Sequence, residues 1–508
     1  LLFNLIIITM FNIIKLNAKD NIAVAPMNIP VGSKISSDLN AENEIPFGHK
    51  ISLNNIKKGE LIYKYGQIIG IAIDEIKKGS HVHSHNIVFH EFERNYKFRK
   101  QDIKKEFKKD KFFYGFKRLN GTVGTRNYIG LISTVNCSAT VVKKIANKIN
   151  FYLKENNFKN IDGAVCLKHS SGCGMNTSGK GMEVFNRTIE GFKSHQNFGK
   201  VFVVGLGCEC AQISLYNNKN TDNDIEYLNI QDEGGTNQII NKVYNKVIKE
   251  LPNINSIERT KSELSELTLA LQCGGSDSYS GITANPALGF AADLLVEYGG
   301  STILSETPEI YGAEHLLIDR ALKESDVTKL VNQIKWWKDY TRINNSSLDN
   351  NPSPGNKKGG LTTILEKSLG AVAKSGNSTM ISVLDYAEKI SEKGFHFMDS
   401  PGYDPVSVTG QVAAGSNLIC FTTGRGSCFG FKPTPSLKIA TNTNMYNNLE
   451  EDMDINAGTI MDGISSIEEI GTNIFNELIE VASGKKTKSE INEYGDDEFN
   501  PWVIGATM

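Results

Sequence analysis

The stretch Leu271–Gly289 holds the densest group of side chains in the chain that could do chemistry. It brings Cys273, Ser276, Asp277 and Ser280 into a glycine-containing turn, after an apolar run and before a segment with helical spacing. Backbone amides freed by glycines, together with a thiol and small hydroxyls, suit a small polyhydroxy or acidic ligand. A tight turn around a buried structural cysteine is the alternative for a single Gly-Gly pair. The recurrence of this arrangement along the chain favours a binding site.

Three more cysteines follow predicted strands at intervals of about one strand–helix unit: Cys137, Cys173 and Cys208. His169 stands shortly before the second of them. In a parallel sheet, the loops at the carboxyl ends of the strands gather along one edge, where ligands bind. We therefore expect the three cysteines and His169 to meet in space although they are distant in sequence. A lone cysteine would more often belong to the core, but three at equivalent strand ends indicate a site.

Histidines mark a second candidate site near the N-terminus. His81, His83 and His85 alternate with other residues, so a strand would put all three imidazoles on one face. His49 lies in a separate turn. A solvated polar edge strand explains the pattern as well as contact with a metal or a substrate does. Both interpretations stay open at this point.

The elements that must position these residues fall into four segments. Residues 10–90 alternate short strands with Lys-Gly turns, which predicts a small all-β domain. Residues 91–113 are rich in charge and predict a solvated linker. Residues 114–260, which carry the three spaced cysteines, and residues 261–508 alternate apolar strands with helical segments. Apolar strands without alternation imply parallel sheets covered on both faces, so we predict an α/β fold with a β-rich N-terminal domain.

The composition limits the function classes. The 508 residues are 40% hydrophobic and 22% charged, with a formal net charge of −2, which is typical of a soluble globular protein and argues against a nucleic-acid-binding surface. The 8 cysteines are scattered, which fits a reducing compartment better than a disulfide framework. Residues 1–14 are apolar but lack the basic start of a signal peptide and the length of a membrane span. We expect translation from Met10 and a cytoplasmic protein without membrane or nucleic-acid partners, and we leave a homo-oligomer open.

Many short motifs follow one another along nearly the whole chain, from about Asn12 to the end. They are Gly48-His49-Lys50, Gly124-Thr-Arg126-Asn127, His169-x-x-Gly-Cys173, Gly205-Leu-Gly-Cys208-Glu209, Cys273-Gly-Gly-Ser-Asp277, Ser280-Gly-x-Thr-Ala-Asn285-Pro, Asn351-Pro-Ser-Pro-Gly-Asn356-Lys357, Thr423-Gly-Arg425-Gly and Lys438-Ile-Ala-Thr441-Asn442. In this order they resemble the altronate/galactarate dehydratases, which remove water from sugar acids. So many segments in the same order make a strong signal.

The resemblance implies a fold, a cofactor and a substrate class. Members of the family have an N-terminal β-rich SAF-type domain followed by a large α/β catalytic portion, and their activity depends on iron or a similar divalent metal. We therefore expect Fe2+, an iron–sulfur cluster or Mn2+, and a small-molecule sugar acid as the partner. His81-Val-His83-x-His85-Asn86 looks like the altronate branch, whereas Asp454-Ile-Asn456-Ala-Gly458 and Val481-Ala-Ser-Gly look more like the galactarate branch. D-altronate is the expected substrate, with galactarate as the alternative.

Dehydration of a sugar acid determines what the site must contain. A base must take the proton next to the carboxylate, a cation must stabilise the enediolate, and an acid must protonate the leaving hydroxyl. We assign the metal to Cys137, Cys173 and Cys208, with His169 as a further ligand and Cys273 in reserve, and all-thiolate ligation would favour a cluster. The other expected residues are Lys357, Arg126 and Arg425 for the substrate carboxylate, His49 or His169 for proton transfer, Glu306 or Asp277 as acid or base, and Ser276, Ser280, Asn285, Asn356, Thr423 and Thr441 for substrate binding.

Two other classes of protein remain open. A related lyase could eliminate sulfonate from a sulfolactate-type acid, because a different leaving group needs little change in the site. A non-catalytic sugar-acid-binding protein could keep the same fold with structural cysteines. Retention of the cysteine, histidine and lysine motifs argues against this last interpretation.

Overall fold

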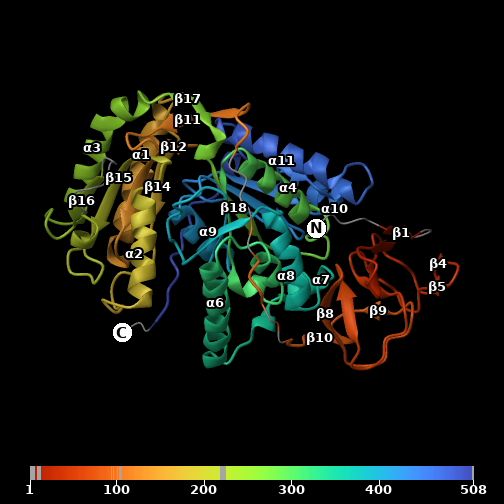
Figure 1. Ribbon diagram of the computed structural model, residues 1–508. Helices are drawn as coiled ribbons and strands as arrows, with labels where there is room; N and C mark the ends of the chain where they lie inside the picture. Colours follow the sequence, from red (N-terminus) through yellow and green to blue (C-terminus); the bar gives the residue numbers. More distant parts are fainter. Residues whose placement is uncertain are drawn as a thin grey trace.

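A computed structural model of the protein describes residues 6–8, 13–92, 94, 96–99, 101, 106–217 and 225–505. The expected start at Met10 lies outside the described residues. Figure 1 shows a β-rich domain in red, an α/β domain in orange to light green, and a larger α/β domain in green to blue that lies between the other two. The predicted fold class, a β-rich N-terminal domain followed by a large α/β portion with parallel sheets, is confirmed.

The N-terminal domain consists of short antiparallel strands. One sheet has the order β1-β2-β3-β6-β9, a second has the order β10-β8-β7, and β4 pairs with β5. Its turns depend on glycine, because Gly59 and Gly79 adopt positive φ angles that other residues rarely take. The strands are β1 (Ile6–Ile8), β2 (Ile13–Lys15), β3 (Ile22–Val24), β4 (Lys34–Ser36), β5 (Leu39–Asn40), β6 (Lys50–Ser52), β7 (Leu61–Lys64), β8 (Gln67–Ala72), β9 (His81–Val82) and β10 (Ile87–Val88).

The second domain is built on a four-stranded parallel sheet of order β14-β13-β15-β16. Helices α1 and α3 pack together on one face, and α2 covers the other face, where it contacts α9 (Asp404–Ala413) of the third domain. Burial from both sides explains why the central strand β13 is apolar up to its last residue, Ser133. The elements are β13 (Tyr128–Ser133), α1 (Asn136–Glu155), β14 (Gly163–Leu167), α2 (Lys180–Lys193), β15 (Phe198–Gly205), β16 (Ile225–Asn229) and α3 (Thr236–Asn255).

The third domain has a seven-stranded parallel sheet of order β20-β21-β19-β18-β22-β23-β24. Helices α4 and α11 pack together on one face, and α9 lies on the other. The strands are β18 (Thr268–Cys273), β19 (Ser301–Leu304), β20 (Met380–Leu384), β21 (Phe395–Met398), β22 (Leu418–Thr423), β23 (Ser436–Ala440) and β24 (Ile455–Asn456). The other elements include α4 (Ala284–Glu297), η3 (Thr307–Ile310), α5 (His315–Ile318), α6 (Glu324–Ile343), α7 (Pro354–Lys358), α8 (Ile364–Val372), η5 (Ala373–Ser375), α10 (Thr443–Asn448), α11 (Ile467–Ala482) and α12 (Lys488–Ile491).

A small antiparallel sheet joins the second and third domains. The chain enters the second domain through β11 (Phe112–Lys117) and β12 (Val123–Gly124) and leaves it through β17 (Arg259–Glu263), which pairs with β11. Before this point, Tyr96 and Phe98 of the predicted linker pack against the apolar core of the third domain. In the described parts of the chain, no helix combines the length and apolar character that crossing a membrane requires.

A buried ion-pair network docks the N-terminal domain on α8. Lys50 Nζ and Lys64 Nζ lie 2.9 Å and 2.8 Å from the two carboxylate oxygens of Glu366, and all three side chains are 0% exposed. Burial alone would raise the pKa of Glu366, but the two ammonium groups hold it well below its ordinary value. Burial lowers the pKa of Lys50 to about 8. At this contact between the domains, a single carboxylate compensates two buried cations.

We predict that Glu366→Gln lowers the free energy of unfolding at pH 7 by about 3–5 kcal/mol, because two buried ammonium groups lose their carboxylate. The folded-state pKa of Glu366 lies below its ordinary value of 4.5, so this stabilisation is present above pH 4.5 and is lost as the pH falls further. Denaturant unfolding at several pH values measures both effects. Asp38→Asn, which breaks the exposed Lys78–Asp38 pair, is the control and should change little. Equal stability of Glu366→Gln and the unmodified protein at pH 7 would contradict the prediction.

Candidate active site

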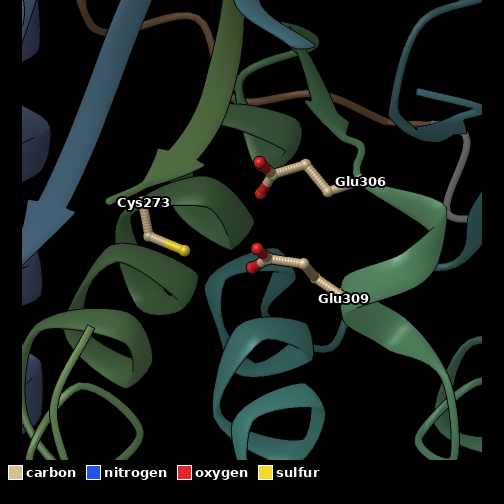
Figure 2. A group of neighbouring side chains, drawn as sticks. All are labelled: Cys273, Glu306 and Glu309. Carbon is tan, nitrogen blue, oxygen red and sulfur yellow. The ribbon is translucent and has the colours of Figure 1, made fainter. Parts of the chain in front are cut away.

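One thiol and two carboxylates converge at the carboxyl edge of the seven-stranded sheet. Cys273 is the last residue of β18, Glu306 follows β19, and Glu309 lies in η3. All three are buried and their ligand atoms lie within 4.8 Å of one another, which no other such group among the described residues achieves. Figure 2 shows the sulfur and the two carboxylates pointing toward a common centre. The sequence identified Cys273 and Glu306 as site residues but assigned no role to Glu309.

Glu306 is held in an unusual backbone conformation. Its φ of 75° places a non-glycine residue in the left-handed region, which costs about 1–3 kcal/mol. Ser400 supports this conformation, because its Oγ accepts a hydrogen bond from the Glu306 amide and its carbonyl accepts one from the Thr307 amide, each at 3.0 Å. The chain therefore turns sharply after β19, and this turn lets the carboxylates of Glu306 and Glu309 face the same centre.

Two buried lysines provide positive charge to this group. Lys374 Nζ lies 2.9 Å from Cys273 Sγ and 3.8 Å from the Glu306 carboxylate. Lys367 Nζ lies 2.7 Å from the Glu309 carboxylate. The lysines come from α8 and the adjoining η5, about two helical turns apart, which places them on one side of this segment. The sequence analysis missed both, because no local motif marks them.

Burial and the neighbouring groups together shift the pKa values of these side chains. Burial, with the neighbouring Glu309 and Cys273, raises the pKa of Glu306 well above its ordinary value. Burial and Glu309 raise the pKa of Asp404, at the start of α9, to about 7. Burial opposes the charge on Lys374, but Cys273 and Glu306 raise its pKa above the ordinary value. The environment therefore favours the protonated form of Glu306 and the charged form of Lys374.

The donor set fits a divalent metal ion. Glu306 Oε1 and Glu309 Oε2 are buried, and within the described structure neither has a hydrogen-bond partner. An unpaired buried carboxylate oxygen is costly, and a cation is a ligand that removes this cost. One thiolate and two carboxylates suit an ion of intermediate softness such as Fe2+, Mn2+ or Zn2+. A bound ion would share Cys273 Sγ with Lys374.

The carboxylate of Asp277 joins three loops, and its predicted role as acid or base stays a prediction. Its carboxylate accepts hydrogen bonds from the hydroxyl of Ser280 at 3.0 Å, from that of Thr441 at 2.9 and 3.0 Å, and from Asn442 Nδ2 at 3.2 Å. A Cβ at Gly424 would lie 2.1 Å from Asp277 Cγ, so only glycine fits there. The loops after β18, β22 and β23 meet on this carboxylate, which also forms part of a cavity wall, and burial raises its pKa. Ser280 and Thr441 serve the same junction.

The remaining predicted substrate-binding residues also bond within the protein. Asn356 Nδ2 donates to the carbonyl of Ser276 at 2.8 Å. Asn285 Nδ2 donates to a carbonyl of α8 at 2.9 Å. Thr423 Oγ1 accepts a hydrogen bond from the backbone amide three residues further on, at 3.1 Å. These contacts shape the loops around the Cys273 turn, and direct contact with a substrate stays a prediction.

A cavity of about 440 Å³ opens where the N-terminal domain meets the third domain. Phe47 comes from the N-terminal domain, and Lys358, Arg425 and Asn442 line the cavity from the third. Arg425 is exposed, and a Cβ at Gly275 would lie 3.2 Å from Arg425 Cβ, so this arginine stands beside the Cys273 turn. The cavity offers two cations and amide groups, which suit a hydroxylated acid.

The predicted histidines gather at the same domain boundary. His49 Nδ1 lies 3.0 Å from His81 Nε2, and the rings of His49 and His83 stack with centroids 4.6 Å apart. His83 Nε2 lies 2.9 Å from the carbonyl oxygen of Lys357 in α7. Burial and the neighbouring imidazoles lower the pKa of His81 to about 3, and burial and a nearby lysine lower that of His83 to about 4. These rings are therefore neutral at pH 7 and belong to the interface between the domains.

The predicted strand through His81–His85 is wrong. Strand β9 ends at Val82, and the next residues form a turn. Asn86 causes this turn, because its Oδ1 accepts from the His83 amide and its Nδ2 donates to the His81 carbonyl, each at 2.9 Å. The imidazoles meet through the turn instead of along one face of a strand.

The other predicted metal residues follow strands of the second domain, on a different sheet from Cys273. Cys137, Cys173 and Cys208 come after β13, β14 and β15, which are neighbours in the sheet, and all three thiols are exposed. The structure therefore divides the predicted metal residues into two groups: Cys273 beside the two glutamates, and the three exposed cysteines at the edge of the second domain's sheet.

His169 has a structural role, and this corrects its assignment as metal ligand or proton carrier. Its Nε2 lies 2.8 Å from the carbonyl oxygen of Ser133, and its Nδ1 accepts from the amide of Ser171 at 3.1 Å. Burial lowers the pKa of His169 to about 4. A neutral imidazole with both nitrogens bonded to backbone holds the loop before Cys173 against β13.

Arg126 is also structural, which corrects its predicted contact with a substrate carboxylate. Its guanidinium makes two hydrogen bonds of 2.6 and 2.7 Å to Glu490, and it donates to the carbonyls of Thr125, Val481 and Lys485 at 2.7–2.9 Å. Arg126 is buried. All five N–H donors of the arginine are thus used, and four of the five bonds attach the second domain to the segment from the end of α11 to α12.

Three family profiles cover the three domains in order. They are described as the Altronate/galactarate dehydratase SAF domain over residues 11–90, the D-galactarate dehydratase/Altronate hydrolase second domain over residues 115–255, and the C-terminal part of D-galactarate/Altronate dehydratase over residues 264–507. With the fold and the buried site, these matches define the protein as a carbon–oxygen lyase of the hydro-lyase type that acts on a sugar acid.

Curated relatives lead to the same family. The chain is 35% identical over 499 residues to altronate dehydratase of Escherichia coli (strain K12), covering 95% of this chain and 97% of that protein. It is 34% identical over 512 residues to altronate dehydratase of Bacillus subtilis (strain 168), covering 98% and 100%. It is 36% identical over 487 residues to galactarate dehydratase (L-threo-forming) of E. coli, covering 93% of each. The chain belongs to the D-galactarate/altronate dehydratase family.

We predict that Arg126→Met and Glu490→Gln each lower the free energy of unfolding by about 3–5 kcal/mol, because each leaves a buried charge without its partner. Since the two residues form one pair, the double variant should lose much less than the sum of the single losses. Denaturant unfolding of the three variants measures this. The KM for the sugar acid should stay unchanged in both single variants. A raised KM in Arg126→Met alone would instead restore Arg126 as a substrate ligand.

Proposed function

We propose that this protein converts D-altronate to a 2-keto-3-deoxy sugar acid, with a divalent metal ion held by Cys273, Glu306 and Glu309. The observation that carries the proposal is the buried cluster of one thiol, two carboxylates and two lysines in a chain of the sugar-acid dehydratase family. The ion that we propose is Fe2+, with Mn2+ as a substitute.

The lysines of the cluster supply fixed charge for the reaction. Dehydration removes the proton from the carbon next to the carboxylate and expels the neighbouring hydroxyl as water. Lys367 and Lys374 hold positive charge where the negative charge of the enediolate develops, and such charge stabilises it most in a site shielded from water. When bound, the metal ion would act as a Lewis acid on the substrate's oxygen atoms.

Asp404 is the residue to which we assign proton transfer. A Cβ at Gly274 would lie 2.3 Å from Asp404 Oδ2, so this carboxylate reaches the turn directly after Cys273. Asp404 is not one of the three proposed metal ligands. Its carboxyl group is thus free to exchange a proton with the substrate while Glu306 and Glu309 hold the ion.

The cavity between the domains is our proposed place for the rest of the substrate. Lys358 and Arg425 bring positive charge there, and Asn444 and Asn448 bring exposed amides that can bond hydroxyl groups. The turn from Cys273 to Asp277 runs from the buried cluster to this cavity, because Asp277 is itself part of the cavity wall. One turn of the chain therefore links the reacting end of the substrate to its hydroxylated chain.

Two observations support D-altronate as the substrate. The altronate dehydratases of two bacteria align with this chain over nearly their full lengths. The pattern His81-Val-His83-x-His85-Asn86 resembles the altronate branch, and its imidazoles lie at the wall between the domains, against α7. Galactarate is the alternative substrate, because a galactarate dehydratase is similarly related.

The proposed metal site predicts a separation between ion binding and turnover. Cys273→Ser and Glu309→Gln should each lose most of the bound Mn2+ and all dehydration, because each removes one of three ligands. Asp404→Asn should keep the ion and lower kcat by about 10²–10⁴-fold. Equilibrium dialysis with Mn2+ measures binding, and formation of the 2-keto-3-deoxy acid measures turnover. Glu314→Gln, a buried carboxylate that bonds Tyr96 outside the cluster, is the matched control. Unchanged Mn2+ binding in Glu309→Gln would contradict the site.

The substrate is tested by incubating the Fe2+-loaded protein with D-altronate, galactarate and (2R)-sulfolactate in parallel. We expect rapid formation of the 2-keto-3-deoxy acid from D-altronate and a kcat/KM at least about tenfold lower on galactarate, because the histidines beside α7 follow the pattern of the altronate branch. A preference for galactarate would overturn the substrate assignment. Sulfite release from sulfolactate would indicate the related lyase, and binding without any product would indicate a non-catalytic protein.

A further inference from the structure

Three exposed cysteines follow neighbouring strands at one edge of the second domain, and the proposed dehydratase site does not use them. The strands β14, β13 and β15 are neighbours, with Ile132 opposite Leu167 and Ser133 opposite Val204. The carboxyl ends of the three strands therefore lie at nearly the same position along the strand direction of the sheet. The cysteines follow these ends at short and similar intervals: Cys137 four residues after Ser133, Cys208 four after Val204, and Cys173 six after Leu167.

Hydrogen bonds hold the three loops against one another beside the cysteines. The amide of Asn136 donates to the carbonyl of Ser171 at 3.0 Å, which links the residue before Cys137 to the Cys173 loop. Glu209, which follows Cys208, accepts a hydrogen bond from Thr134 Oγ1 at 2.7 Å. Each contact lies within three residues of the cysteines that it brings together. The loops therefore form one fixed surface.

Gly172 brings the second loop unusually close to the first. Its φ is +99°, and a Cβ at this position would lie 2.1 Å from the carbonyl oxygen of Thr134. Only glycine permits this approach, which places the neighbouring Cys173 next to the loop that carries Cys137. A cavity of about 100 Å³ lies beside Cys173, with the chain segment around Trp502 as its other wall.

The three thiols are spaced more widely than the ligands of a single tetrahedral ion. Zn2+ with bonds of about 2.3 Å would need its sulfur ligands roughly 3.8 Å apart. The three Sγ atoms do not all lie within 4.8 Å of one another, since the described residues contain one such group and it is elsewhere. Thiolates at wider spacing suit a cluster, which takes each sulfur on a separate iron atom.

We propose that Cys137, Cys173 and Cys208 bind an iron–sulfur cluster of the four-iron class, in addition to the metal ion of the third domain. Three cysteines leave one iron without a protein thiolate, and this iron is open to an oxygen ligand from solvent or a hydroxy acid. The cluster stands independently of the proposed dehydration site, because it lies on another sheet and shares no residue with it.

The test uses the full-length protein, purified without oxygen and supplied with Fe2+ and sulfide. We expect about four acid-labile sulfides per chain, visible charge-transfer absorption, and an electron paramagnetic resonance signal after reduction. Acid-labile sulfide is the decisive quantity, because the site at Cys273 takes none. The triple variant Cys137→Ser, Cys173→Ser, Cys208→Ser should lose the sulfide and the signal while keeping its unfolding transition, since the three side chains are exposed.

Two controls make the result specific. Cys428→Ser removes another exposed cysteine in the third domain and should keep the full sulfide content. Cys273→Ser should keep the cluster and lose Mn2+ binding, so failure of the dehydratase site and failure of the cluster remain distinguishable. Equal sulfide in the triple variant would overturn the proposal, and so would a single Zn2+ bound per chain without sulfide.

Discussion

Burying Glu306, Glu309 and Cys273 in one place is costly unless positive charge is buried with them. Lys367 and Lys374 supply that charge, and both come from α8 and η5. The position of this one segment therefore decides whether the site can exist. Glycines at the contact make the position possible, because a Cβ at residue 281 would lie 2.8 Å from the Cα of residue 370. The close approach brings α8 against the turn that begins at Cys273.

The same helix connects the site to the SAF domain. Glu366 forms ion pairs with Lys50 and Lys64 of the SAF domain, and the next residue, Lys367, forms an ion pair with Glu309 in the cluster. Consecutive residues of a helix point in directions about 100° apart, so one helix can serve both contacts. The SAF domain thus contributes to the site in two ways. It holds the lysine-bearing helix in place, and it closes the cavity that we propose for the substrate.

The sequence predicts the strands, helices and strand-end residues that depend on the local order of residues. It does not reveal the buried ion-pair partners that balance charge between distant parts of the chain. The parallel sheets and the strand-end positions of Cys273 and Glu306 follow from the strand–helix rhythm, because such a sheet gathers its ligands at one edge. Lys367 occupies a helix far along the chain, and its role appears only when the buried carboxylates need a counter-charge. Arg126 stands in a motif that suggested substrate binding, yet its partner Glu490 is 364 residues away. No pattern in one sequence reveals a pairing over that distance.

The central claim is that a metal ion sits on Cys273 and two carboxylates. X-ray absorption at the iron edge tests it most directly, on Fe2+-loaded protein in which Cys137, Cys173 and Cys208 are serine so that no cluster contributes. The account predicts one sulfur neighbour at about 2.3 Å among oxygen neighbours, and loss of that sulfur in the further variant Cys273→Ser. A shell of oxygen and nitrogen alone, or a sulfur neighbour that survives Cys273→Ser, would contradict it.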